Sequence, residues 1–329
     1  MTVATAYWVV RQGEGELRRE ELPAQPAPGA SRVQAECSGV SPGTERLVGL
    51  GQVPAAAAAR MACRGMRGAF TLPVKYGYCL VGKATAGALR GARVFTMHPH
   101  QDLADVADAA ALVLPGWLPA PRALLIPNLE TAWNGVWDAA LQPGEEVAVV
   151  GAGLVGLLLA YVLHRVCDRR ATLFEVDPAR RRFAQQLPFV AAALAPEAGA
   201  TGAFPVVFHA SGRGAGLQTA IDLLGFEGRV IDLSWYGTQA VTLDLGSRFH
   251  DQRQRLIASQ VGSVAPALRH SHDPAARLQE VLRLLDTDAL DPLLGPATPF
   301  AALPGLMRGI YAGHNQDLLP RIAYPQGTR

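Results

Sequence analysis

The sequence has few cysteines and almost no excess of charge. Only four of its 329 residues are cysteine, and Cys37, Cys63, Cys79 and Cys167 include no C-x-x-C pair. That scatter excludes a disulfide framework and a structural zinc motif, and it is typical of reduced thiols in a cytosolic protein. Lys and Arg number 30 against 28 Asp and Glu, a net charge of +2. Nucleic acid is therefore not an expected partner, because a surface that follows phosphates needs a large, clustered basic excess.

The sequence also lacks the marks of export and of membrane insertion. Its Met-Thr-Val start has no basic region, apolar stretch or cleavage site, so we expect a cytoplasmic protein. The longest apolar run, 147–163, contains three glycines and ends on His164, which predicts a buried strand and helix and no membrane span. With 49% hydrophobic and 18% charged residues, the chain predicts a soluble globular protein whose length favours two domains.

The pattern of apolar and turn-forming residues changes twice along the chain. Short β-type runs at 6–10, 32–37, 80–86 and 93–97, separated by Gly and Pro turns, predict a β-rich first domain. From about residue 128, apolar helical stretches alternate with short β-branched strands, which is typical of a parallel α/β sheet. After residue 261 the pattern predicts a helix at about 274–285 and a short strand at 321–324.

A glycine motif opens the α/β part. A predicted buried strand at 146–150 runs into Gly151-Ala-Gly-Leu-Val-Gly156, which opens an apolar helix at 157–166. Gly151 permits the tight turn, Gly153 lets a pyrophosphate approach the backbone, and Gly156 allows the helix to pack closely. The phosphates are expected at the helix N-terminus, beside Leu154 and Val155. This context predicts a dinucleotide-binding site.

An acidic residue follows the second predicted strand of this part. Asp177 and Pro178 form a helix N-cap and first turn, so the strand tip is Glu175, 24 positions after Gly151. An acid about 20 residues after the glycines binds the adenosine ribose and repels a 2′-phosphate, which favours NAD over NADP. The alternative is that Arg180 and its neighbours hold that phosphate. A methyltransferase that binds S-adenosylmethionine is a further alternative, which Gly156 and the β-rich domain in front argue against.

Several segments, in their order along the chain, resemble the medium-chain dehydrogenase/reductase superfamily. These are Ser38-Gly-Val-Ser-Pro-Gly-Thr-Glu45, Tyr76-Gly-Tyr-Cys-Leu-Val-Gly-Lys83, Gly91-Ala-Arg-Val94, Gln142-Pro-Gly-Glu-Glu-Val147, and Leu290-Asp-Pro-Leu293 through Thr298-Pro-Phe300. The resemblance implies an α/β protein with a GroES-like β-rich catalytic domain, 1–127 and 263–329, around a Rossmann domain, 128–262. It also implies that substrate and nicotinamide meet between the domains, and that the protein is a homodimer.

The chain departs from the superfamily where metal-dependent members hold zinc. The corresponding positions are Ser41 or Pro42, Tyr78 and about Pro127, and no conventional zinc site can be built from these side chains. The four-cysteine lobe is also missing, because 94–114 contains no cysteine. We therefore predict a zinc-free member with no metal.

Hydride transfer without a metal still needs a group that polarises the carbonyl or moves a proton. Tyr78 is one candidate, although it could simply fill the space that the metal leaves. Thr44 matches the hydroxyl that relays protons in alcohol-oxidising relatives, and its alternative, like that of Ser41, is to stabilise the loop. His98 and His100 follow the strand at 93–97 and would share one face if the extended backbone continued. They could offer an acid/base or two metal ligands, or be structural.

The superfamily places two further cofactor contacts. The strand ends at 206–212 and 229–235 flank the nicotinamide in relatives, which makes Ser211 a candidate. Arg321 lies where relatives can place an arginine near the pyrophosphate, and a surface arginine is the alternative reading.

One loop indicates a narrower resemblance. Ser38 to Arg46, followed by Gly51-Gln-Val-Pro54, is most similar to the bacteriochlorophyllide dehydrogenase branch, which oxidises a hydroxyethyl group on a chlorin ring. Together these features predict a zinc-independent NAD(P)-dependent oxidoreductase that interconverts an alcohol and a carbonyl on a bulky small-molecule substrate. The alternatives are a quinone or enoyl reductase and a non-catalytic dinucleotide-binding protein.

Overall fold

The computed structural model describes residues 1–325, which divide into two compact units. One unit consists of Met1–Pro127 with the residues from Leu290 onward, and the other of Asn128–Ala289. The unit built from both ends of the chain is tied together by Arg122, whose guanidinium makes an ion pair of 2.8 Å with Asp291. Residues 326–329, which end the predicted first domain, lie outside the described residues.

The second unit extends further along the chain than the sequence pattern predicted. The expected return to the first domain was at residue 263, whereas the structure returns at Leu290. The reason is helix α9 (Pro274–Leu284), which is bound to helix α4 (Ile126–Ala139) through polar side chains. Arg277 donates to the Asn134 side chain at 2.8 Å, and the Trp133 indole donates to Glu280 at 2.6 Å.

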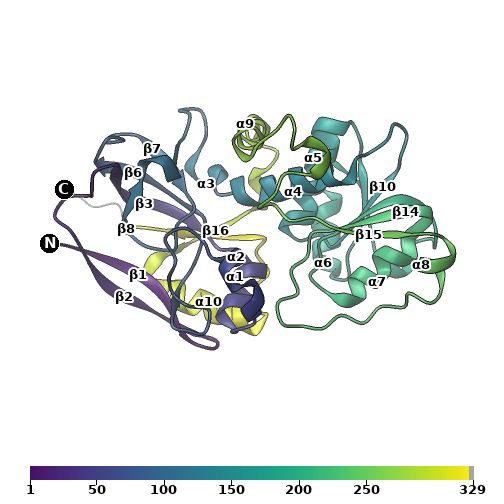
Figure 1. The fold of residues 1–329 in the computed structure, drawn as a ribbon, viewed down its shortest axis with the longest axis horizontal. Coiled ribbons are helices and arrows are strands. Elements are labelled where there is room, and N and C mark those ends of the chain that lie inside the picture. Colours follow the sequence, from purple (N-terminus) through teal and green to yellow (C-terminus); the bar gives the residue numbers. More distant parts are fainter. Residues whose placement is uncertain (326–329) are drawn as a thin grey trace. The chain divides into compact units, whose positions relative to one another are not determined.

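The first unit is β-rich (Figure 1). In residues 1–325 it contains one sheet in the order β2-β1-β5-β4 and another in the order β16-β17-β3-β6-β7-β9, with β8 paired to β3. The strands are β1 Thr2–Arg11, β2 Glu14–Leu22, β3 Ala30–Gly39, β4 Arg67–Gly68, β5 Val74–Lys75, β6 Leu80–Ala86, β7 Arg93–Thr96, β8 Leu103–Ala107, β9 Ala111–Val113, β16 Leu294–Pro299 and β17 Leu319–Ala323. The helices are α1 Pro42–Gly49, α2 Ala58–Met61, α3 Ala120–Ala123 and α10 Leu303–Ala312.

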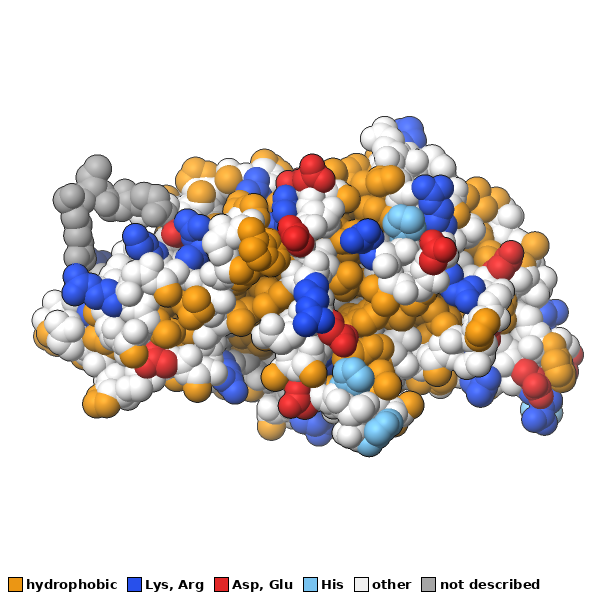
Figure 2. All heavy atoms as spheres, turned by 90° about the horizontal axis from the view of Figure 1, so that it is seen from above, with side chains coloured by type: hydrophobic (Ala, Val, Ile, Leu, Met, Phe, Trp, Pro, Cys, Tyr) orange, Lys and Arg blue, Asp and Glu red, His pale blue; other side chains and the backbone are white. Residues whose placement is uncertain are grey.

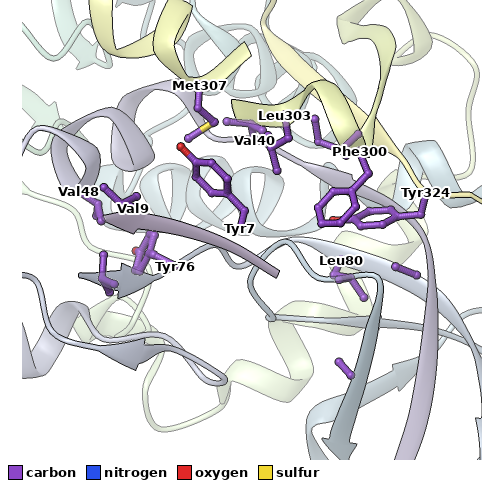
Figure 3. Close-up of a cluster of buried hydrophobic side chains, with 14 of the residues drawn as sticks. Tyr7, Val9, Val40, Val48, Tyr76, Leu80, Phe300, Leu303, Met307 and Tyr324 are labelled. Atoms are coloured by element: carbon purple, nitrogen blue, oxygen red, sulfur yellow. The ribbon is translucent and has the colours of Figure 1, made fainter. Parts of the chain in front are cut away.

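The core of this unit joins side chains from both ends of the chain (Figure 3). Tyr7 and Val9 of β1 lie with Leu303 and Met307 of α10 in one buried cluster. The Phe300 and Tyr324 rings pack with centroids 4.5 Å apart, and the Tyr7 and Tyr311 hydroxyls lie 3.2 Å apart. Burial of these aromatic side chains explains why the C-terminal segment belongs to this unit.

The second unit is a Rossmann fold. Within the described chain its parallel sheet has the order β12-β11-β10-β13-β14-β15, which is the 3-2-1-4-5-6 arrangement of dinucleotide-binding domains. Helices α5, α6 and α7 pack against its strands (Figure 1). The strands are β10 Val147–Val150, β11 Ala171–Phe174, β12 Val190–Leu194, β13 Phe204–His209, β14 Leu224–Asp232 and β15 Arg255–Ala258. The remaining helices are α5 Leu154–Cys167, α6 Pro178–Gln185, α7 Gly214–Leu223 and α8 Arg248–Asp251.

The surface carries charges of both signs. Figure 2 shows basic and acidic side chains interspersed among apolar ones on the face that it draws. Among residues 1–325, no helix combines the length and the apolar character that a membrane crossing requires.

Candidate functional site

The glycine motif forms the turn between β10 and α5. Gly151 has φ +106°, a conformation that favours glycine, and a Cβ on Gly156 would come within 1.9 Å of the Gly151 carbonyl oxygen. These two glycines are therefore required by the fold itself. A Cβ on Gly153 would meet no atom within 4 Å, so the space in front of Gly153 is open.

Helix α5 presents its N-terminus to that open space. It begins at Leu154, three positions before the predicted start at 157, with Gly153 as N-cap and no side chain that caps it. The first amide groups of a helix have no partner within the helix, and an anion satisfies them well. The prediction that phosphates fit beside Leu154 and Val155 agrees with this geometry, because no side chain competes for the site.

Glu175 lies beside the same turn. β11 ends at Phe174, and the buried Glu175 carboxylate accepts a hydrogen bond from the Ala152 amide at 2.8 Å and another from the Asp177 amide at 2.9 Å. Asp177 is the N-cap of α6, as the sequence predicts, and accepts from the Ala179 amide at 2.7 Å. The Arg180 Nε is buried and has no hydrogen-bond partner in the described chain.

A second polar network occupies the ends of β13 and β14. His209 is fully buried, with its Nδ1 2.9 Å from the Asp232 carboxylate and its Nε2 2.7 Å from the Ser211 hydroxyl. Tyr236 stacks on the imidazole and donates to Asp232 at 3.0 Å. The Ser211 backbone also packs against Gly151, since its nitrogen would lie 2.8 Å from a Cβ there. Ser211 thus lies beside the glycine turn, and its contact with a cofactor stays a prediction.

In the first unit, three predicted catalytic residues meet at the start of α1. The Tyr78 hydroxyl donates to the Thr44 hydroxyl at 3.5 Å, and Ser41 interacts with the same phenol. Burial raises the pKa of Tyr78 well above its ordinary value, although the hydroxyls of Ser41 and Thr44 oppose the shift. The phenol is therefore protonated at neutral pH and can donate a hydrogen bond.

A chain of buried hydrogen bonds supports this cluster. One Glu45 oxygen accepts from the Ser41 amide at 2.8 Å, and the other lies 2.9 Å from the His100 Nε2. The His100 Nδ1 lies 2.7 Å from the Ser38 hydroxyl, which lies 2.9 Å from the Tyr324 hydroxyl. Glu45 and His100 are 3% and 0% exposed, so this network fixes the Ser41–Glu45 segment rather than contacting solvent.

The two histidines of the His98-Pro99-His100 segment do not act together. β7 ends at Thr96, so the extended backbone that would align them does not continue. His98 bonds to the Pro99 carbonyl and packs against Gly65, whereas His100 bonds to Glu45. The grouping of His98 with Tyr78, Thr44 and Ser41 has no support in these contacts.

No protein-family model matches this sequence. Among solved structures, the chain is similar to a zinc-binding dehydrogenase from Sinorhizobium meliloti 1021 bound to NADP, with 18% identity, a TM-score of 0.75, and coverage of 98% of this chain and 100% of that one. It is also similar to 2R,3R-butanediol dehydrogenase from Bacillus subtilis, with 16% identity, a TM-score of 0.75 and the same coverage. An Escherichia coli CFT073 alcohol dehydrogenase complexed with NADH shares 14% identity at a TM-score of 0.76, with coverage of 99% and 100%.

This chain has the medium-chain dehydrogenase/reductase fold. The predicted pairing of a GroES-like domain with a Rossmann domain is confirmed by the two units and by these neighbours. The likeness concerns the arrangement of the backbone, because fewer than one residue in five is shared.

The zinc ion of metal-dependent medium-chain dehydrogenases does not fit the side chains at the corresponding positions of this chain. Ser41, Pro42, Tyr78 and Pro127 offer neither a thiolate nor an imidazole, the ligands that zinc prefers. In residues 1–325, no three His, Cys, Asp or Glu side chains are grouped so that they could hold a metal ion.

The sequence predicted a role for Arg321 but did not predict the Glu45–His100 pair. Arg321 lies on β17 in the first unit, where its Nε donates to the Gly295 carbonyl at 2.5 Å. Its contact with a cofactor stays a prediction. The Glu45–His100 pair was not predicted as a unit. No local sequence signal marks this pair, because the acid and the histidine are 55 residues apart and only the fold brings them together.

Proposed function

We propose that this protein is an NAD-dependent oxidoreductase that interconverts an alcohol and a carbonyl without catalytic zinc. The observation that carries the proposal is the open space at Gly153, in front of an uncapped helix N-terminus and beside the buried Glu175 carboxylate. Solved structures of the same fold that hold NADP or NADH support a nicotinamide dinucleotide as the ligand of this turn.

Different residues bind different parts of the dinucleotide. Gly153, Leu154 and Val155 hold the pyrophosphate through backbone amides. The Glu175 carboxylate keeps free lone pairs after its two backbone hydrogen bonds, and these accept the adenosine ribose hydroxyls. A 2′-phosphate beside that carboxylate is repelled, so NAD is preferred to NADP. When bound, the dinucleotide supplies or accepts the hydride.

The proton chemistry belongs to Tyr78. In the reduction direction its phenol donates a hydrogen bond and then the proton to the carbonyl oxygen, and in oxidation the path reverses. Thr44 and Ser41, both partly exposed, are the hydroxyls that pass a proton from solvent back to the phenol, and the buried Glu45–His100 network holds their segment in place. The resemblance of residues 38–54 to the bacteriochlorophyllide dehydrogenase branch supports a secondary alcohol or ketone on a bulky substrate.

The proposal is tested by binding and turnover with the purified full-length protein. NADH fluorescence and thermal melting should show binding of NADH at least about tenfold tighter than of NADPH. A panel of bulky secondary alcohols and ketones should then give turnover followed at the nicotinamide absorbance. Binding without turnover on this panel and on quinones and enones would indicate a non-catalytic protein, and turnover on the enones or quinones alone would indicate a reductase. Absence of any dinucleotide binding would refute the proposal.

A further inference from the structure

The first unit contains a pocket of about 700 Å³ that the proposed reaction does not use. The size is within the range of small-molecule sites, which are mostly apolar with a few convergent polar groups. Leu22 and Val106 contribute apolar wall, and Lys75, His98 and Gln101 contribute polar groups. All lining residues belong to the segment 20–110, so the pocket is complete within one unit.

His98 offers this pocket a hydrogen-bond acceptor. Its Nδ1 lies 2.9 Å from the Pro99 carbonyl oxygen, which can only accept, so the proton is on Nδ1 and Nε2 carries a lone pair. No donor in the described chain bonds to that Nε2, although the side chain is 9% exposed. This Nε2 is not one of the fully buried polar atoms that lack a partner in the described chain, so it is open to the pocket that His98 lines, and a ligand hydroxyl would bond to it there in place of water.

Lys75 offers a donor to the same pocket. Its ammonium, on a side chain only 4% exposed, donates to Glu20 at 2.7 Å and to Gln101 at 2.8 Å. An ammonium carries three N–H groups, so one is left after these two bonds. A hydroxyl group can accept from Lys75 and donate to His98, and it matches this donor–acceptor pair.

The exposed lining residues carry a small excess of positive charge. Arg64 and Arg67 line the pocket and form no ion pair with any described residue. Of the acidic lining residues, Glu20 is paired with Lys75 and Asp105 with Arg32, so only the exposed Glu21 opposes the two arginines. Guanidinium groups recognise carboxylates through paired hydrogen bonds.

We propose that this pocket binds a small organic carboxylate that carries a hydroxyl group on an apolar body. The hydroxyl lies between His98 Nε2 and Lys75 Nζ, the apolar body contacts Leu22 and Val106, and the carboxylate meets Arg64 and Arg67. The site is separate from the glycine turn of the second unit, so binding does not require a dinucleotide.

The test measures the affinity of three probes by calorimetry on the full-length protein, with and without saturating NADH. The probes are 4-hydroxybenzoate, benzoate and phenol. We expect 4-hydroxybenzoate to bind with a Kd below about 1 mM, and the other two to bind about tenfold more weakly, because each lacks one polar contact.

Two variants assign the contacts. In His98→Phe the affinity for 4-hydroxybenzoate should fall about tenfold to that of benzoate, while benzoate itself is unaffected. In the double variant Arg64→Gln/Arg67→Gln, 4-hydroxybenzoate should fall to the affinity of phenol. Arg90→Gln is the matched control, since Arg90 is an exposed arginine of the same unit outside the pocket.

Three results would overturn the proposal. The first is that 4-hydroxybenzoate does not bind at up to about 10 mM. The second is that it binds equally well to the double arginine variant, whose changes are on the surface and leave the fold intact. The third is competition with NADH, which would place the probe at the glycine turn. Failure to bind NADH with normal probe binding would refute only the proposed oxidoreductase.

Discussion

Tyr78 stands where metal-dependent relatives are expected to place a zinc-binding histidine, and its hydroxyl contacts Thr44. Replacing it by Phe keeps the ring and removes the proton. We expect Tyr78→Phe to lower kcat about 100-fold, the usual size of a general acid–base contribution, and to leave the NADH dissociation constant unchanged. Steady-state kinetics and fluorescence titration measure the two quantities. A variant with full kcat would show that Tyr78 only fills space.

His98 gives a prediction about pH. Burial, assisted by the Lys75 charge, lowers the pKa of His98 from 6.5 to about 4, so below pH 6.5 the unfolded chain takes up a proton that the folded chain does not. Stability should therefore fall as the pH falls from 6.5 towards 4, by roughly 3 kcal/mol from this residue. His98→Gln should flatten that part of the curve, as measured by urea unfolding at several pH values. Equal slopes in the two proteins would contradict the assignment.

At the level of single residues, the sequence predicted local interactions but not long-range ones. Asp177 was predicted as an N-cap and is one, because an aspartate before a proline has a local preference that the chain retains. The Glu45–His100 pair was not predicted, because it depends on the loop after β7 meeting the start of α1. Long-range pairing of this kind has no local signal.

Substitutions in the turn between β10 and α5 can test its proposed role, because a side chain would have a different effect at each of its glycines. Gly156→Ala should destabilise the protein by several kcal/mol, since its Cβ would overlap the Gly151 carbonyl. Gly153→Ala should leave the melting temperature of the ligand-free protein unchanged and weaken NADH binding about tenfold or more, because its Cβ enters the space assigned to the pyrophosphate.

Thermal melting with and without NADH separates these two effects. Normal NADH affinity in Gly153→Ala would show that the open space is not a phosphate site. A folded, stable Gly156→Ala would show that the helix can move away from the turn.

Elements with a buried, periodic pattern were the ones that the sequence predicted. β10 is buried along its whole length between two helical layers, and its uninterrupted apolar run marked it. β2 was missed because its sequence, Glu-Gly-Glu-Leu-Arg-Arg-Glu-Glu-Leu, is dominated by charge. It forms an edge strand held to β1 by backbone pairing, where charged side chains are favourable. Polar edge strands resemble loops in a sequence.

At the scale of the whole molecule, the sequence predicted the presence of two units, but long-range contacts determine where the second unit ends. The change of sequence pattern along the chain predicted two units, and the resemblance to the medium-chain dehydrogenase/reductase superfamily implied their nested order. The end of the second unit could not be placed, because the polar contacts that join α9 to α4, from Arg277 to Asn134 and from Trp133 to Glu280, connect residues far apart in the chain. No change in composition marks Leu290.

The scarcity of cysteine leads to a prediction about the whole protein. Metal-dependent members of this fold gain stability and activity from zinc, so chelators should inactivate them. Here the matching positions are Ser41, Pro42, Tyr78 and Pro127, and the proposed function assigns the proton transfer to Tyr78. We expect treatment with 1,10-phenanthroline to leave both turnover and melting temperature unchanged, and elemental analysis of the purified protein to find far less than one zinc per chain. Activity that is lost on chelation and restored by zinc would reverse this conclusion, because it would require a ligand set that these side chains do not provide.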